Sequence, residues 1–270
     1  MIYKSFKKII KRLLLKYFSN FYKNRTYGFI TKLRTENLKP NRTVEPELTL
    51  LKHFINHGDC CLDVGANIGH YTFMFEKLAG PENVYAFEPI LDNYNHLNEV
   101  FKNCHIHQIA LSNENKIKKF KIPIINDIVF DTRGKLDIDI IEGNENGFKT
   151  FDVSCETMDS FVKNKKLNRV DFIKIDVEGH ELKVLEGAIK TLKQFKPCMM
   201  IEIEQRHHKI NIDYIFNFIT TLGYEISFYN LEKLRFEQLS NFDIEKYQSV
   251  KNIKTSNYIN NFFCIARNNV

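Results

Sequence analysis

Apolar and polar positions follow a helical or a strand period through most of residues 44–230. EPELTLLKHFINHGD has a helical period that ends at Gly58, and CCLDVGANIGHYTFMFEKLAG then predicts a strand, a tight turn and a helix to about Ala79. NVYAFEP predicts a second strand that ends at Glu88, residues 92–101 predict a helix, and HIHQIALS predicts a third strand. Strands that alternate with helices in this way predict a parallel sheet with helices on both faces.

The same alternation returns after residue 170. RVDFIKID predicts a fourth strand that ends at Asp176, Gly179 permits a sharp turn, and ELKVLEGAIKTLK has the period of a helix that packs on the sheet. PCMMIEIEQ predicts a fifth strand. Ligands bind beyond the carboxyl ends of the strands in a doubly wound sheet, so we expect Asp176 and the loop after it to face the same crevice as Gly65 and Glu88.

The regular spacing lapses between residues 112 and 170. KIKKFKIPII and GFKTFDVSCETMDSF predict two strands, and the residues between them are rich in Asp, Asn and Gly. This insertion is either a loop that covers a site or an inert surface excursion. If it covers an acceptor, Arg133 is a candidate for binding a carboxylate or phosphate of the substrate, with a solvated surface arginine as the alternative.

The first 43 residues are predicted to form a separate basic segment. A helix over residues 2–18 would place Ile, Leu, Phe and Tyr side chains on one face and Lys and Arg on the other. Its apolar runs are too short for a membrane span or an export signal. We expect this cationic amphipathic helix to lie on an anionic membrane surface; docking on the rest of the chain or on another protein is the alternative. The expected location is the cytoplasm, with peripheral attachment to the inner face of the membrane.

The charge of the chain is concentrated in this segment. The net charge is +6, but residues 1–42 contribute +11 and the remainder contributes −5. The basic character therefore does not predict that the main domain, residues 44–270, binds nucleic acid, and we expect no nucleic-acid partner.

Six cysteines are present, and none forms a C-x-x-C pair. Most lie in runs that predict buried strands. We therefore expect buried free thiols in a reducing cytosol rather than a disulfide framework or a zinc site.

The turn after the first strand is the first candidate site. Glycines there let a ligand approach the backbone, and the helix that follows offers free N–H groups. A dinucleotide-binding turn would need glycines at positions 65, 67 and 70, where the chain has Gly65, Asn67 and His70. The chain therefore lacks the dinucleotide-binding fingerprint.

Two carboxylates indicate a different ligand. Asp63, just before the glycine turn, suits a ligand with an ammonium or sulfonium group. Glu88, at the end of the second strand, can accept hydrogen bonds from both hydroxyls of a ribose. Together with the turn they point to S-adenosylmethionine as the cofactor.

The sequence resembles the FkbM family of S-adenosylmethionine-dependent methyltransferases. The resemblance is carried by GDCCLDVGANIGHYT, VYAFEP, VDFIKIDVEGHELKVLEGA and PCMMIEIE, in that order, and covers about residues 44–230. It implies a class I methyltransferase (Rossmann-like) fold, a doubly wound seven-stranded sheet with the last strand antiparallel. To this the chain adds a β-hairpin insertion and the N-terminal amphipathic helix.

The resemblance also implies cofactor positions, at Asp63, Gly65, Asn67, Gly69 and Glu88. Ser112, after the third strand, is a further candidate for the adenine edge, with ordinary turn chemistry as the alternative.

Three residues after the fourth strand are candidates for the acceptor's proton. Asp176 is favoured by its position, His180 has a pKa suited to a general base or else makes a structural hydrogen bond, and Glu178 lies in the loop itself. On the fifth strand a buried carboxylate is costly unless it is paired or reaches the crevice, and the family resemblance favours Glu202 as the substrate-binding one. Asp176, Glu178 and Glu202 are also the oxygen ligands that would hold Mg²⁺, although we favour a metal-free site.

We therefore expect an S-adenosylmethionine-dependent O-methyltransferase that methylates a sugar hydroxyl in a surface glycan or a related small molecule. An N- or protein methyltransferase of the same fold is one alternative. A non-catalytic cofactor-binding scaffold, recruited to a membrane glycan-assembly complex, is another. The sequence leaves the oligomeric state open.

Overall fold

The computed structural model describes residues 47–125, 128–129, 134–136, 145–253, 255 and 257–267, all within one compact unit, Asn41–Val270. The basic segment of residues 1–43 and Arg133 lie outside the described residues. Within the described ranges, no helix is long and apolar enough to cross a membrane.

The main sheet has the strand order β11-β10-β12-β9-β8-β1-β2-β3. Its parallel strands are β1 (Cys61–Val64), β2 (Val84–Phe87), β3 (His105–His107), β8 (Phe172–Ile175) and β9 (Cys198–Glu202). Strand β12 (Asn261–Ala266) runs antiparallel to both β9 and β10 (Tyr224–Asn230). This arrangement confirms the predicted doubly wound sheet with an antiparallel last strand, and β11 (Arg235–Gln238) adds an eighth strand at the edge.

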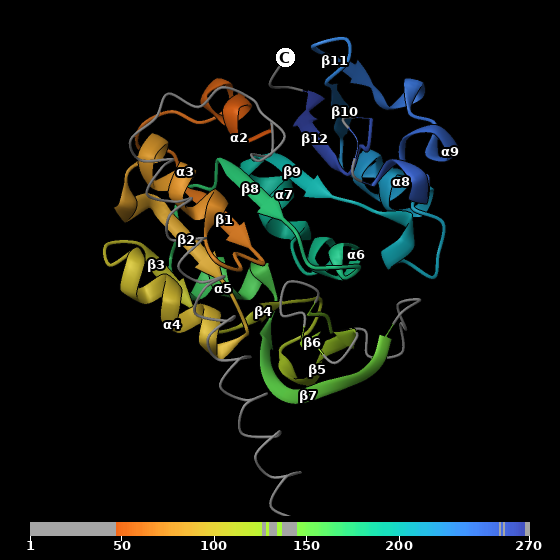
Figure 1. Cartoon of the computed structure of the whole chain (residues 1–270). Coiled ribbons are helices and arrows are strands. Elements are labelled where there is room, and N and C mark those ends of the chain that lie inside the picture. Colours follow the sequence, from red (N-terminus) through yellow and green to blue (C-terminus); the bar gives the residue numbers. More distant parts are fainter. Residues whose placement is uncertain are drawn as a thin grey trace, which may run out of the picture. The chain divides into compact units, whose positions relative to one another are not determined.

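Helices cover both faces of this sheet (Figure 1). Ile173 and Ile175 of β8 belong to a core with α5 (Met158–Asn164), α6 (Glu181–Glu186), α7 (Ile189–Phe195) and α8 (Asp213–Thr221). On the opposite face, Phe75 of α3 (His70–Ala79) contacts the ring of Phe172, with 5.5 Å between ring centroids. The remaining α-helices are α2 (Glu47–Leu50), α4 (Leu91–Val100) and α9 (Ile244–Tyr247).

Short 3₁₀ turns link several elements, at Leu51–His53, Pro81–Asn83, Gln205–His207 (η4), Leu239–Asn241 and Val250–Asn252. The helix predicted up to Gly58 is thus shorter in the structure, as α2 and one such turn. The helix predicted from Glu181 is split into α6 and α7 at Gly187 and Ala188. Gly187 lies against the backbone of Ser112, where a Cβ would be 2.0 Å from the carbonyl oxygen.

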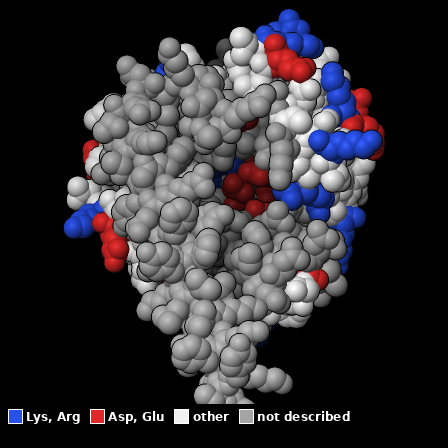
Figure 2. Space-filling model, viewed as in Figure 1, with Lys and Arg blue, Asp and Glu red and all other residues white. Residues whose placement is uncertain are grey.

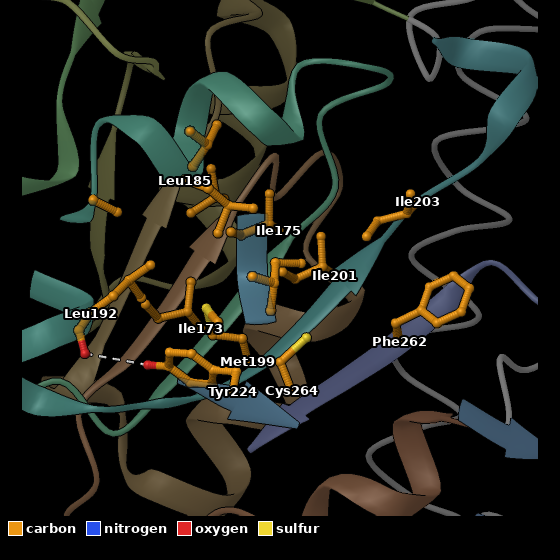
Figure 3. Close-up of a cluster of buried hydrophobic side chains, with 14 of the residues drawn as sticks. Ile173, Ile175, Leu185, Leu192, Met199, Ile201, Ile203, Tyr224, Phe262 and Cys264 are labelled. Carbon is orange, nitrogen blue, oxygen red and sulfur yellow. Dashed lines mark hydrogen bonds between the residues drawn. The ribbon is translucent and has the colours of Figure 1, made fainter. Parts of the chain in front are cut away.

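The core between β8, β9, β12 and the helices is almost wholly apolar (Figure 3). Tyr224 is the polar exception in this view, and its hydroxyl donates a hydrogen bond to the carbonyl oxygen of Leu192 in α7, at 3.4 Å. Burial of these side chains stabilises the packing of the helices on this face of the sheet.

The insertion folds as a second sheet with the order β4-β7-β5-β6. Its two long strands, β5 (Lys116–Ile125) and β7 (Glu145–Glu156), form the predicted hairpin, and β4 (Ala110–Leu111) and β6 (Ile128–Val129) extend it. The predicted third strand is therefore divided, because β3 stays in the main sheet while β4 pairs with β7. Figure 1 shows this second sheet near the arrowhead of β1.

Four of the six cysteines are buried and all six are free thiols, as the sequence predicted. Burial raises the pKa of the Cys60 and Cys198 thiols to about 12, so they remain protonated at neutral pH.

Candidate functional site

A pocket of about 250 Å³ opens at the carboxyl ends of β1, β2, β8 and β9. One part of its wall is polar and comes from the loops that follow these strands. Another part is apolar and includes Ile90 and Ile109, together with Phe120 and Leu136 from the insertion. The insertion therefore lies at the site and is not an inert surface excursion.

The glycine turn after β1 is shaped by contact with β8. Gly65 has a φ of 83°, and a Cβ there would lie 1.8 Å from the carbonyl oxygen of Asp176. The absence of a side chain thus lets the β1 turn and the β8 end meet at the edge of the pocket. Gly69 caps the start of α3 in the left-handed region and packs on Phe101, behind the pocket wall.

Glu88 joins the two loops on the β2 side of the pocket. One carboxylate oxygen accepts a hydrogen bond from the backbone N–H of Asn67 at 2.8 Å, and the other accepts one from the N–H of Ile90 at 2.8 Å. These two hydrogen bonds hold the buried carboxylate in place in the pocket wall.

Asp63 lies below the pocket rather than in its wall. It is buried, and its carboxylate accepts a hydrogen bond from the hydroxyl of Thr72 in α3 at 2.6 Å. Burial raises the pKa of Asp63 to about 6, although Thr72 and the Lys174 ammonium act in the opposite direction. Its part in cofactor binding, expected from the sequence, would be indirect.

The raised pKa of Asp63 gives a testable dependence of stability on pH. Between the unfolded value of 3.8 and about 6, the folded chain holds this proton more tightly than the unfolded chain. The free energy of unfolding should therefore fall by up to about 3 kcal/mol from this group as pH rises through that window. Urea unfolding at pH 4 to 7 should show a smaller decrease for Asp63→Asn, while Asp152→Asn, at an exposed residue, should match wild type. Equal pH dependence in wild type and Asp63→Asn would contradict the assignment.

Asp176 and Glu202 line the pocket from neighbouring strands and approach one buried ammonium group. The Nζ of Lys174 is 3.7 Å from Oδ2 of Asp176 and 4.0 Å from Oε2 of Glu202. Glu202 also accepts a hydrogen bond from the amide of Asn260 at 2.9 Å. Burial and the nearby Asp176 carboxylate raise the pKa of Glu202 well above its usual range.

Glu204 has a different environment. Arg206 and the hydroxyl of Tyr258 both hydrogen-bond to its carboxylate, and these partners outweigh burial and lower the pKa of Glu204 to about 2. Of the two glutamates in this segment, Glu202 is the one that lines the pocket.

The loop after β8 is held by two histidines that the sequence did not single out. His207 Nδ1 is 3.1 Å from Oε2 of Glu178, and His208 Nε2 is 2.9 Å from Oε2 of Glu181. Glu178 has a φ of 53°, which is unfavourable for a residue with a side chain. Gly179 lies against the backbone of His207, and a Cβ at position 179 would be only 2.3 Å from the His207 carbonyl oxygen. The turn η4 thus keeps the loop in its pocket-facing conformation.

Glu181 is the first residue of α6. It is buried and its Oε1 accepts hydrogen bonds from the backbone N–H groups of Val177 (3.2 Å) and Gly179 (3.1 Å). Its carboxylate therefore holds the backbone of the loop between β8 and α6 in place.

His180 lines the pocket and is tied to the end of β4. Its Nε2 is 2.9 Å from the hydroxyl oxygen of Ser112, which also accepts a hydrogen bond from Lys118 Nζ at 3.1 Å. Ser112 is fully buried behind the pocket wall, so its contact is with His180 rather than with the pocket itself.

The structure thus brings most of the predicted site residues to one pocket. Its wall includes seven of them: Gly65, Asn67, Glu88, Asp176, Glu178, His180 and Glu202. Asp63, Gly69 and Ser112 lie behind that wall. Strand-end position was the signal for Gly65, Glu88 and Asp176, and the family resemblance was the signal for Asn67 and Glu202.

A smaller hollow adjoins the pocket and shares Asp176, Glu178 and Glu202 with it. Figure 2 shows acidic side chains gathered in a hollow near the centre of this face. Among the residues that the structure describes, no group of three or more His, Cys, Asp or Glu side chains has an arrangement that could hold a metal ion.

Comparison with known proteins gives a family match over residues 63–226, to the methyltransferase FkbM domain. The chain is also 29% identical over 153 residues to the hexuronic acid methyltransferase AglP of Haloferax volcanii. That alignment covers 54% of this chain and 56% of AglP, so the chain matches little more than half the length of this relative.

Two solved structures are similar at low identity. The FkbM methyltransferase from Methylobacillus flagellatus has a TM-score of 0.48 and 16% identity, over 77% of this chain and 43% of that one. An S-adenosylmethionine-dependent O-methyltransferase from Thermotoga maritima has a TM-score of 0.42 and 10% identity, over 88% of this chain and 70% of that one.

Proposed function

The chain belongs to the FkbM methyltransferase family, and on that premise we propose that it transfers a methyl group from S-adenosylmethionine to a hydroxyl of a sugar, in a surface glycan or a related small molecule. The observation that carries this proposal is the pocket in which Glu88, from the β2 side, faces the carboxylates that follow β8 and β9.

The β1 and β2 side of the pocket fits the cofactor. The fixed carboxylate of Glu88 has acceptor capacity for the two ribose hydroxyls, and Ile90, Ile109 and Leu111 offer an apolar wall of the kind that an adenine ring requires. Gly65 has no side chain, so the turn after β1 can lie close to the end of β8 at the pocket wall. When bound, S-adenosylmethionine supplies an electrophilic methyl group.

The β8 and β9 side fits a polyhydroxylated acceptor. Ionised carboxylates accept hydrogen bonds only, so Asp176, Glu178 and Glu202 suit hydroxyl donors. The hexuronic acid methyltransferase AglP, 29% identical over 153 residues, supports a sugar as the acceptor class.

We assign the proton of the acceptor hydroxyl to Asp176. Its side chain is one-third exposed in the pocket, so it can reach a ligand, and the Lys174 ammonium lies 3.7 Å from its Oδ2. As the acceptor oxygen attacks the methyl carbon, the Asp176 carboxylate would take the proton, and the electron pair of the broken carbon–sulfur bond would stay on sulfur. Glu178 and His180 would orient the acceptor.

The proposed transfer should not need a divalent metal. Lys174 already places a positive charge 3.7 and 4.0 Å from the carboxylates of Asp176 and Glu202, and a cation bound between them would be repelled by it. We expect methyl transfer to be unchanged after dialysis against EDTA. A loss of activity that Mg²⁺ restores would contradict this expectation.

Mass spectrometry of surface glycans tests the acceptor class. Cells that lack the gene should lose one O-methyl group from a sugar, and a wild-type copy should restore it while a copy with Asp176→Asn should not. Identical glycan methylation with and without the gene would contradict a glycan acceptor, and a methylated amine or protein in its place would favour the N- or protein methyltransferase.

A further inference from the structure

Lys174 occupies an unusual place for a charged residue. It lies in β8, at the centre of the main sheet, directly beside Asp63 of β1 and Met200 of β9, and it is fully buried. A buried ammonium group is costly unless it is paired and hydrogen-bonded. Phe172, two positions earlier and therefore on the same face of the sheet, is apolar and fully buried, so a role for the charge at position 174 has to be sought.

The contacts of Lys174 converge from several elements. Its Nζ donates a hydrogen bond to Oδ1 of Asn261 in β12 at 3.1 Å, and it lies 5.0 Å from the centroid of the Tyr71 ring in α3. Towards the pocket it lies between the carboxylates of Asp176 and Glu202, at 3.7 and 4.0 Å. The buried ammonium group is therefore next to two carboxylates that line the pocket, without lining the pocket itself.

We propose that Lys174 is a positioning residue for the transfer, and that its buried ammonium fixes where the Asp176 and Glu202 carboxylates point and allows both to stand side by side in the pocket. The proposal rests on the proposed function for what those carboxylates do. It does not depend on that function for the claim that Lys174 holds them.

The charges around Lys174 explain why it is needed. Among the residues that the structure describes, carboxyl groups face it from three strands, Asp63 from β1, Asp176 from β8 and Glu202 from β9, and its neighbours in β12 and α3 include the neutral Asn261 and Tyr71. Close carboxylates repel one another in a medium of low dielectric constant. The Lys174 ammonium lowers the pKa of Asp63 and of Glu202, against the burial that raises both.

A lysine-to-methionine exchange tests this role because it keeps the length and removes the charge. In Lys174→Met the carboxyl group of Glu202 should lose its proton at a pH higher by about one unit or more than in wild type. Carbon-13 NMR of labelled glutamate side chains measures this midpoint, and the signal is assigned by its absence in Glu202→Gln. Lys119→Met is the matched control, because Lys119 is an exposed lysine paired with Asp152 on the insertion.

A purely structural lysine would lower the unfolding midpoint without moving the Glu202 titration, so an unchanged titration in folded Lys174→Met would overturn the proposal. If Lys174→Met does not fold, Lys174→Met/Glu202→Gln carries the test. Removal of both charges should restore folding, and failure of the double variant to fold while Glu202→Gln alone folds would contradict the proposed pairing.

These outcomes separate the inference from the proposed function. A wild-type chain that transfers no methyl group to any acceptor, but whose Glu202 titration moves in Lys174→Met, would refute the function and leave the role of Lys174 intact. Methyl transfer by wild type, together with an unmoved Glu202 titration in Lys174→Met, would refute the role of Lys174 and leave the proposed function intact.

Discussion

Asp176→Asn is expected to slow methyl transfer by about 10²- to 10⁴-fold, the range that loss of a general base gives, while cofactor affinity changes little. Asparagine has nearly the same shape but cannot take a proton from the acceptor. The fold should tolerate the exchange, because the backbone contacts of Asp176 are kept: its N–H donates to the carbonyl oxygen of Val64 at 2.9 Å, and its carbonyl packs on Gly65. Lys174 loses one charged neighbour but keeps Glu202 and Asn261.

The measurement combines turnover with calorimetric binding of S-adenosylhomocysteine for each variant. Asp213→Asn is the control, because this exposed aspartate begins α8 away from the pocket. Transfer by Asp176→Asn at the wild-type rate would show that another group takes the proton, and Glu178→Gln and His180→Gln would then be compared.

Glu88→Gln should weaken the binding of S-adenosylhomocysteine by about 100-fold or more. The variant loses the negative charge that strengthens hydrogen bonds from the ribose hydroxyls. Its amide group would also direct N–H donors at the backbone N–H of Asn67 or Ile90, both of which need an acceptor. Two effects, weaker ligand contacts and a disturbed loop, therefore act in the same direction.

Calorimetry of Glu88→Gln is compared with that of Glu82→Gln, in which an exposed glutamate before β2 is changed in the same way. The control should bind as wild type does. Equal affinity in wild type and Glu88→Gln would place the ribose elsewhere and would separate Glu88 from the cofactor.

Much of the fold could be predicted because it follows from local period. Alternating strands and helices predicted the parallel sheet, and the period of RVDFIKID predicted the strand observed as β8. The eighth strand, β11, and the division of the third predicted strand into β3 and β4 could not be predicted. Both depend on which neighbour a short strand finds in space, and that pairing leaves no trace in the period of the sequence.

The site was predictable where residues follow strand ends. Gly65, Glu88, Asp176 and Glu202 all come at or just after the carboxyl end of a parallel strand, and all four line the pocket. The rule gives position along the chain but not the direction of a side chain. Asp63 lies in β1 itself and turns towards Thr72 and α3, so it lies below the pocket.

The residues that the sequence did not reveal act on other site residues. Lys174 interrupts an apolar strand, which marks it as unusual, but only the structure shows that Asp176, Glu202 and Asn261 surround its ammonium group. His207 is important through Glu178, which lies 29 positions earlier in the sequence. Contacts of this kind arise from packing between loops.

The most direct test is calorimetric titration of the purified, folded wild-type chain with S-adenosylmethionine. We expect saturable binding to one site, and we expect S-adenosylhomocysteine to compete for it. The absence of binding to a chain whose folding is verified by circular dichroism would contradict the assignment of this pocket to the cofactor, and with it the proposed methyl transfer.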